Sequence, residues 1–373
     1  MQPNNEKIFE DLMRAYRLKG KIVSVAVLRS GNVNDTYTVV TDYNGSERQY
    51  IAQRVNLHVF REPLKVAENI AAVTKHIESK LIADGVTDLR RRVVKFYQIP
   101  GEGYYYYDPD GGCWRVSSFI FNSVTVNDAN TPFLLYETGS AFGEFQRLLA
   151  DFRADELNVT IPDFHNTEKR LENLIKAAGE DKFGRLCELR EDCDFLLSLS
   201  DYAPFFSNEL ASGRIPLRVT HNDTKCNNIM FDRTTGGHLA VIDLDTVMPG
   251  FAAHDFGDAV RFAANPAGED CDDPSRVRLD LESYRHIARG FIPQVRGLLN
   301  ERELETLPEG VLVITYELAM RFMTDYLEGD VYFKCKKEKH NLIRARAQTA
   351  LLRDITAKMP QLHSILGDVV ENA

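Results

Sequence analysis

Strand-like and helical segments are segregated along this chain, and that segregation limits the folds it can adopt. The first third holds most of the short β-branched runs that are typical of strands. Asn44-Gly45 separates two of these runs and is typical of a tight hairpin turn. After Pro63, apolar residues three and four apart predict a helix over 64–81. The expected strands are 22–28, 36–41, 49–55, 92–97, 104–107 and 114–121.

After residue 122 the pattern changes, and long helical periodicities dominate. The expected helices are 132–152, 167–178, 183–199, 278–291, 304–326 and 341–358. The expected strands of this part are 217–220, 229–231 and 239–242. The sequence therefore predicts an α+β, bilobal protein, with a small β-rich lobe over 1–121, a larger mainly helical lobe over 122–373, and a cleft between them.

Charge and composition exclude several classes of protein. The chain has 373 residues with 45 basic and 55 acidic side chains, and this net negative charge argues against general binding to nucleic acid or to an anionic membrane. The most apolar stretch, 311–323, is interrupted by Glu317 and Arg321, so no membrane span is expected. The first 14 residues lack the apolar region of a signal peptide. The six cysteines form no CxxC pair, and we expect reduced thiols in a cytoplasmic protein rather than the disulfide framework of a short secreted one.

The segment 219–230 carries the residues with the clearest chemistry. It contains His221-x-Asp223 with Asn228 five positions later, and an apolar strand downstream ends in Asp243 and Asp245. Phosphoryl transfer from ATP requires this layout, in which one Asp accepts or orients the acceptor hydroxyl while Asn and Asp oxygens hold Mg²⁺. The alternative is purely structural, with Asp223 and Asn228 in side-chain turns and Asp243 capping a helix.

These motifs resemble those of the aminoglycoside phosphotransferase and choline kinase superfamily, which has a protein-kinase-like fold. Further segments resemble the N-acetylhexosamine 1-kinases, which phosphorylate the anomeric hydroxyl of GlcNAc or GalNAc. The segments are VTHNDTK (219–225), VIDLDTVMPG (241–250), HDFGDAVRF (254–262), RFMTDYLEGDVYF (321–333), IPDFHNT (161–167) and IAQRVN (51–56). The resemblance spans nearly the whole chain, as far as residue 333.

The resemblance implies roles for the catalytic and metal-binding positions. Asp223 corresponds to the catalytic base, and positioning of the hydroxyl is an important part of its work because phosphoryl-transfer transition states are loose. Asn228 and Asp243 are implied to bind magnesium, and Asp245 to bind a second metal ion or to support the first site. His221 and Asp255 are expected to brace the catalytic loop.

The nucleotide-binding positions depart from the protein-kinase pattern. Instead of a GxGxxG loop, the chain has Gly31, Asn32 and Asn34 between the first two expected strands, where backbone N–H groups and amides can hold phosphates. An ordinary hairpin turn is the alternative. Arg54 ends the third strand and is expected to clamp phosphate oxygens, with Glu68 on the next helix as its partner. A surface ion pair is the alternative for these two residues.

Three residues are expected to bind the acceptor. Arg321 and Asp325 lie on one face of a helix at positions i and i+4, and Tyr332 follows them. A plain i, i+4 ion pair is the alternative. Other candidates for this role are Arg261, Asp258, His165 and Asn166.

The sequence thus predicts an ATP- and Mg²⁺-dependent kinase that makes N-acetylhexosamine 1-phosphate, with ATP and a small sugar as its partners. The residues alone lead to a small-molecule kinase, and the sugar comes from the resemblance. The alternatives are the same fold acting on an aminoglycoside, choline, homoserine or a ketosamine, or a nucleotide-binding pseudokinase. Oligomeric state is not predicted.

Overall fold

The computed structural model describes residues 3–28 and 33–373, and Gly31 and Asn32 lie outside these residues. The chain divides into two compact units. The first comprises residues 1–123, 157–161 and 242–247, and the second comprises 124–156, 162–241 and 248–373. An antiparallel sheet dominates the first unit and helices dominate the second, which confirms the predicted α+β fold.

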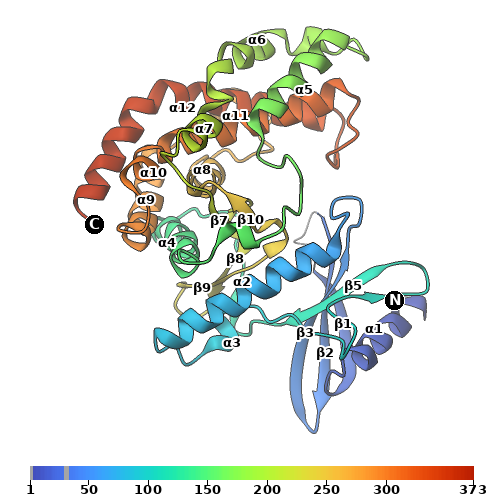
Figure 1. The fold of residues 1–373 in the computed structure, drawn as a ribbon. Coiled ribbons are helices and arrows are strands. Elements are labelled where there is room, and N and C mark those ends of the chain that lie inside the picture. The colour runs from blue at the N-terminus through green and yellow to red at the C-terminus, as the bar shows by residue number, and fades with distance from the viewer. Residues whose placement is uncertain (1–2, 29–32) are drawn as a thin grey trace. The chain divides into compact units, whose positions relative to one another are not determined.

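The first unit is built on a five-stranded antiparallel sheet with the order β1-β2-β3-β5-β4 (Figure 1). Its strands are β1 (Lys21–Leu28), β2 (Asp35–Tyr43), β3 (Ser46–Val55), β4 (Tyr106–Tyr107) and β5 (Cys113–Ser118). Its helices are α1 (Pro3–Ala15), α2 (Pro63–Ala83) and α3 (Leu89–Arg92). The predicted Asn44-Gly45 hairpin is confirmed, since both residues have positive φ and Tyr43 pairs with Ser46.

One face of this sheet is covered by α1, a helix that we did not expect. Phe9, Leu12 and Tyr16 of α1 pack with Tyr50 and Trp114 of the sheet in one buried cluster. The segment is mostly polar in sequence, and its few apolar residues are the ones that pack on the sheet. The expected strand 92–97 was also wrong, because α3 ends at Arg92 and Phe96 makes only an isolated bridge with Ser117.

The second unit is mainly helical. Its helices are α4 (Pro132–Leu148), α5 (Thr167–Glu180), α6 (Arg190–Ser198), α7 (Phe205–Ala211), α8 (Ala252–Ala263), α9 (Leu281–Val295), α10 (Glu301–Glu305), α11 (Leu307–Leu327) and α12 (His340–Glu371). Its short strands are β7 (Arg218–Thr220), β8 (Ile229–Asp232), β9 (His238–Val241) and β10 (Met248–Gly250), and β6 (Ser123–Val124) lies at the boundary along the chain.

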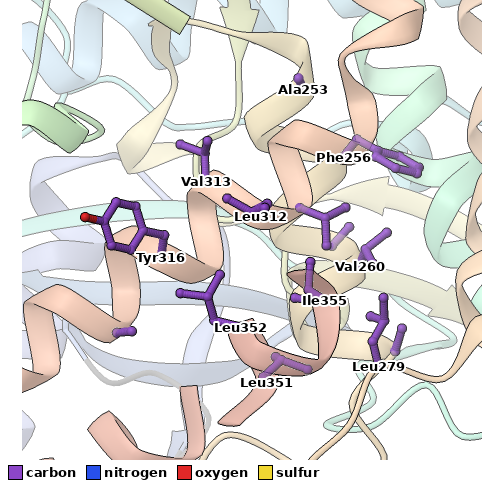
Figure 2. Packing of buried hydrophobic residues seen from close by; sticks show 14 of the residues in the cluster. Ala253, Phe256, Val260, Leu279, Leu312, Val313, Tyr316, Leu351, Leu352 and Ile355 are labelled. Carbon is purple, nitrogen blue, oxygen red and sulfur yellow. The ribbon is translucent and has the colours of Figure 1, made fainter. Parts of the chain in front are cut away.

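The core of the second unit lies where α8, α11 and α12 pack together. Figure 2 shows Phe256 and Val260 of α8 among apolar side chains of α11 and α12. The backbones of α8 and α11 approach closely at two glycines, because a Cβ on Gly257 would lie 2.3 Å from the carbonyl oxygen of Gly310. This packing fixes α8 and α11, and both helices carry residues of the candidate site.

Two helical segments differ from the expected ones. The stretch 183–199 is divided, because the regular helix α6 begins only at Arg190, and α12 continues to Glu371 despite Pro360. Within the residues that the structure describes, no helix combines the length and apolar character needed to cross a bilayer.

Candidate active site

The expected catalytic loop of the second unit is held at its start by a buried carboxylate. The loop runs from His221 to Lys225, between β7 and a 3₁₀ turn (Cys226–Asn228). Asp255, in the first turn of α8, accepts hydrogen bonds from the backbone N–H groups of His221 and Asn222, both at 2.8 Å. Gln146 of α4 also donates to this carboxylate at 2.8 Å. The prediction that Asp255 braces the catalytic loop is confirmed.

A second carboxylate holds the next part of the loop. Asp258, one turn further along α8, accepts a hydrogen bond of 2.9 Å from the backbone N–H of Thr224. Arg261 pairs with Asp258 and with Glu269, each at 2.8 Å, and its side chain is almost fully buried. Asp258 and Arg261, which were alternative candidates for acceptor binding, therefore serve the internal framework of the loop.

Asp223 lies among groups that keep it ionised. Its Oδ1 pairs with the Nζ of Lys225 at 2.9 Å, and its Oδ2 accepts from the Nδ2 of Asn228 at 3.1 Å. Burial alone would raise the pKa of Asp223, but the nearby Lys225 ammonium lowers it below its ordinary value. A partly exposed, ionised carboxylate can accept the hydrogen bond of an acceptor hydroxyl. The sequence motif identified Asp223 but gave Lys225 no role.

The side chain of Asn228 is oriented by the same loop. Its Nδ2 donates to the carbonyl oxygen of Asp223 at 2.8 Å as well as to the carboxylate. An amide oxygen fixed in this way is a suitable ligand for a hard cation such as Mg²⁺.

The hairpin β8–β9 connects Asn228 to Asp243 along the chain. Asn228 directly precedes Ile229, Ile229 pairs with Val241, and Asp243 follows two residues later. Asp243 belongs to the first unit, is exposed, and has a left-handed backbone with φ of 60°. Asp tolerates this conformation better than most residues.

His238, on β9, gives this hairpin a pH-dependent anchor. Its Nδ1 lies 2.6 Å from Glu137 and its Nε2 lies 3.4 Å from Glu144, and both carboxylates belong to α4. Burial alone would lower the pKa of His238, but the hydrogen bonds to Glu137 and Glu144 raise it to about 9. The imidazolium therefore stabilises the folded protein fully below its unfolded pKa of about 6.5.

We expect this stabilisation to be lost as the pH rises through about 9, because the folded-state pKa lies above the unfolded one. The loss should be about 1–3 kcal/mol in the free energy of unfolding. Urea unfolding between pH 6 and pH 10 measures it, with the His238→Gln variant as the comparison. The difference in stability between the two proteins should shrink over this range, and a constant difference would contradict the assignment.

Asp245 of the first unit is committed to a buried ion pair. Arg115 of β5 binds both of its carboxylate oxygens, with a distance of 2.9 Å from Nη2 to Oδ2. Asn34 donates to the same Oδ2 at 2.8 Å. The side chains of Arg115 and Asp245 are 4% and 3% exposed. The expected metal-binding role of Asp245 does not fit these contacts, because both of its carboxylate oxygens already accept hydrogen bonds from Arg115 or Asn34.

The structure assigns Asn34 to this same network and separates Arg54 from Glu68. Asn34 accepts a hydrogen bond from the backbone N–H of Asn56 at 3.0 Å as well as holding Asp245. In the sheet register, Arg54 is opposite Trp114. The ring of Trp114 packs against α1, and directly paired residues share one face of a sheet, so Arg54 lies on the face that α1 covers. Glu68 of α2 instead accepts from Asn158 at 3.1 Å.

The expected pairing of Arg54 with Glu68 is therefore not found in the chain as described. The physical reason is the two-residue period of a strand, which turns Gln53 and Arg54 to opposite faces. Gln53 is opposite Arg115 and accepts from its Nε at 2.9 Å. Burial would lower the pKa of Arg115, but Asp245 keeps it above its ordinary value, so the guanidinium stays charged. An arginine within the apolar strand 113–118 was the available sequence signal for it.

The three predicted acceptor residues line one cavity of the second unit. Arg321, Asp325 and Tyr332 surround a volume of about 130 Å³ together with Arg170 of α5. The guanidinium of Arg321 lies 5.5 Å from the ring centroid of Phe164 and 5.9 Å from that of Tyr332. The structure thus brings these three residues together, and it adds Arg170.

Asp325 and Asn166 have internal structural partners. The carboxylate of Asp325 accepts backbone N–H groups at distances of 2.7–2.9 Å from Val331, Tyr332 and Phe333. It therefore orders the loop that carries Tyr332. Asn166 caps the N-terminus of α5 by accepting from the N–H of Lys169 at 3.0 Å. Asn166, another candidate for acceptor binding, is thus a helix cap in this structure.

Several solved structures have folds similar to that of this chain. The chain is 12% identical to a spectinomycin phosphotransferase solved with ADP and spectinomycin, with a TM-score of 0.55 over 95% of this chain and 98% of that one. It is 14% identical to a choline kinase from Cryptosporidium parvum, with a TM-score of 0.54 over 98% and 99%. It is also 14% identical to an ethanolamine kinase from Plasmodium vivax, with a TM-score of 0.50 over 87% and 82%.

These likenesses confirm the kinase-like fold predicted from the sequence. Residues 24–291 also match the model of the phosphotransferase enzyme family. That match covers most of the chain, including the catalytic loop, both carboxylates after β9 and helix α8. The chain therefore belongs to the phosphotransferase enzyme family.

Proposed function

We propose that this protein is an ATP- and Mg²⁺-dependent kinase that phosphorylates the anomeric hydroxyl of N-acetylhexosamines, giving N-acetylhexosamine 1-phosphate and ADP. The observation that carries the proposal is the braced catalytic loop, in which Asp223 is ionised beside Lys225 and Asn228. The solved neighbour with bound ADP supports a nucleotide donor. We assign ATP binding to the lobe 1–121 and acceptor binding to the lobe 122–373. The scattered cysteines favour a cytoplasmic location.

In the proposed mechanism, Asp223 accepts a hydrogen bond from the acceptor hydroxyl and orients its oxygen for in-line attack on the γ-phosphorus of ATP. The proton passes to Asp223 as the new P–O bond forms and the bond to ADP breaks. Lys225 holds Asp223 in its ionised form until that transfer. Asp255 keeps the loop rigid, so the hydroxyl and the carboxylate need little rearrangement.

Asn228 and Asp243 are the proposed Mg²⁺ ligands. When bound, Mg²⁺ supplies neutralisation of phosphate charge. The fit rests on the chemistry of the donors, since Asn228 Oδ1 is oriented by its own amide nitrogen and Asp243 is exposed. Along the chain, Asn228 directly precedes the β8–β9 hairpin and Asp243 follows it by two residues.

The charge of the acceptor cavity favours a neutral sugar over a cationic acceptor. Burial and the charge of the Arg321 guanidinium lower the pKa of Arg170, and both side chains line this cavity. Asp325 and Glu328 line the same cavity, so the two guanidinium groups are balanced by two carboxylates. Such a lining has no excess negative charge to attract an ammonium group, whereas sugar hydroxyls and an amide carbonyl can accept hydrogen bonds from the guanidinium groups. Choline and aminoglycosides are cationic, so this observation weighs against them.

The proposal is tested by ATP consumption with GlcNAc, GalNAc, glucose, galactose, choline, homoserine and kanamycin, each with Mg²⁺ and with excess EDTA. We expect turnover with GlcNAc or GalNAc that is lost with EDTA. Turnover with choline or kanamycin alone would replace the proposed acceptor and leave the catalytic loop assignment intact. Absence of nucleotide turnover and of ATP binding would overturn the proposal as a whole.

The Arg321→Gln variant should raise the KM for the N-acetylhexosamine by about 10–100-fold, because a hydrogen bond to a charged group contributes about 1.5–3 kcal/mol. The KM for ATP should not change. The measurement is steady-state kinetics with each substrate varied in turn. Arg353→Gln is a matched control, since Arg353 also stacks on a ring, at 3.9 Å from the centroid of Phe195, but lines a different cavity. An unchanged acceptor KM in Arg321→Gln would remove this residue from the acceptor site.

A further inference from the structure

His165 is held by hydrogen-bond acceptors on both sides of its ring. Its Nδ1 lies 2.9 Å from Glu317 Oε1, and its Nε2 lies 3.2 Å from the carbonyl oxygen of Asn222. Neither an ionised carboxylate nor a carbonyl oxygen has a proton to donate. Both contacts are therefore satisfied as hydrogen bonds only when the ring carries two protons. The geometry thus favours an imidazolium at His165.

The charges around this ring agree with the geometry. Burial alone would lower the pKa of His165, but Glu317 of α11 raises it above its ordinary value. Arg321 of α11 lowers the pKa of His165, but its effect is smaller than that of Glu317. His254 of α8, with its ring centroid 5.5 Å away, is neutral, because burial and then His165 lower its pKa to about 3. The Glu317 side chain is 2% exposed, so solvent screens this pair weakly.

The contact with Asn222 bears directly on Asp223. Asn222 precedes Asp223 and has a left-handed backbone with φ of 64°. Asp255 fixes the N–H of Asn222, and His165 fixes its carbonyl, which belongs to the peptide bond that joins Asn222 to Asp223. Asn222 is therefore held by Asp255 of α8 through its N–H and by His165 through its carbonyl oxygen. Fixing this peptide plane also fixes the direction in which the Asp223 side chain projects.

The other side of the ring connects to the acceptor cavity. Glu317 also lies 4.0 Å from Arg321, one turn further along α11, and Arg321 lines that cavity. Glu317 is thus shared between the cation that faces the acceptor and the cation that holds the catalytic loop. A ligand that draws Arg321 toward the cavity leaves His165 as the cation paired with Glu317, beside the Thr167 hydroxyl that donates to Glu317 Oε2 at 3.4 Å.

We propose that His165 is a positioning residue, an imidazolium between Glu317 and the Asn222 carbonyl that directs Asp223 and connects the acceptor cavity to the catalytic loop. This inference rests on the proposed function in one respect, namely that Asp223 receives the acceptor proton. It does not depend on which acceptor is used.

The kinetic test compares the pH profile of kcat in the wild type, His165→Gln and Glu317→Gln, with the best acceptor found. We expect His165→Gln to lower kcat about 10–100-fold with little change in the KM for ATP, since small misplacements of a reacting group cost this much. Glu317→Gln should lower kcat at neutral pH and regain it only as the pH falls, because burial without the carboxylate favours the neutral ring. His363→Gln is the control, since it removes a histidine of α12 that also faces a glutamate, 3.1 Å from Glu309, and it should leave the profile unshifted.

A second measurement is independent of any acceptor. Nitrogen-15 NMR of labelled histidines, with His165→Gln as the assignment standard, should show both ring nitrogens of His165 protonated at pH 7. A neutral His165 ring at pH 7 would overturn the proposal, as would variants that lower kcat by the same factor at every pH. If no acceptor is turned over, the proposed function fails, whereas the NMR result still decides the state of His165.

Discussion

Replacing Asp223 with Asn is expected to lower kcat by about three orders of magnitude, within the range of a well-positioned general base. The amide has nearly the same shape as the carboxylate but cannot accept the acceptor proton. It also removes the charge that pairs with Lys225 at 2.9 Å. The measurement is single-turnover and steady-state kinetics with an N-acetylhexosamine, with thermal unfolding to confirm that the variant folds.

Asp201→Asn is a matched control, because it makes the same chemical change on an exposed side chain of the second unit. This control should keep wild-type kcat. If Asp223→Asn retains kcat within a few-fold of the wild type, Asp223 is not the base. If ATP binding is lost as well, the effect lies in folding or nucleotide binding rather than in proton transfer.

The largest effect on stability is expected from Arg115→Met. The variant leaves the Asp245 carboxylate, 3% exposed, without its cation, and breaking one side of a buried ion pair costs about 3–5 kcal/mol in the free energy of unfolding. Asn34 still donates one hydrogen bond to Asp245 but brings no charge. Urea unfolding of the wild type and the variant measures the loss.

The double variant Arg115→Met/Asp245→Leu separates lost charge pairing from lost packing. Because it removes both charges, it should recover much of the stability that the single variant loses. If the free energy of unfolding of Arg115→Met lies within about 1 kcal/mol of the wild-type value, a buried ion pair of this kind is contradicted. A double variant less stable than the single one would mean that packing, rather than the unpaired carboxylate, dominates.

Local signals in the sequence predicted much of the fold and part of the site. The Asn44-Gly45 turn specifies its hairpin through backbone conformations that few other residues adopt. Asp223 and Asn228 were recognisable because their chemistry depends on a short segment of chain. Asp255 was placed correctly as a brace, although the backbone N–H groups that it accepts from, those of His221 and Asn222, lie 34 and 33 positions earlier in the chain.

The errors concern contacts between segments far apart in the chain. Arg54 was assigned to the nucleotide because it ends a strand at the expected position, but the pleat turns Gln53, and not Arg54, toward Arg115. Asp245 was grouped with Asp243 by proximity in sequence, whereas its partner Arg115 comes 130 residues earlier. No local pattern reports such a pairing. The partners of His165, Glu317 on α11 and Asn222 in the catalytic loop, could not be predicted either, because they lie 152 and 57 positions away in the chain.

The most direct test of the proposed activity is phosphorus NMR of the product formed from ATP, Mg²⁺ and GlcNAc or GalNAc. We expect a new phosphate resonance coupled to the anomeric proton of the sugar, appearing together with ADP and absent with Asp223→Asn. A phosphate coupled to another sugar proton would contradict the assigned position. Formation of inorganic phosphate alone, at the same rate with and without sugar, would contradict sugar phosphorylation itself.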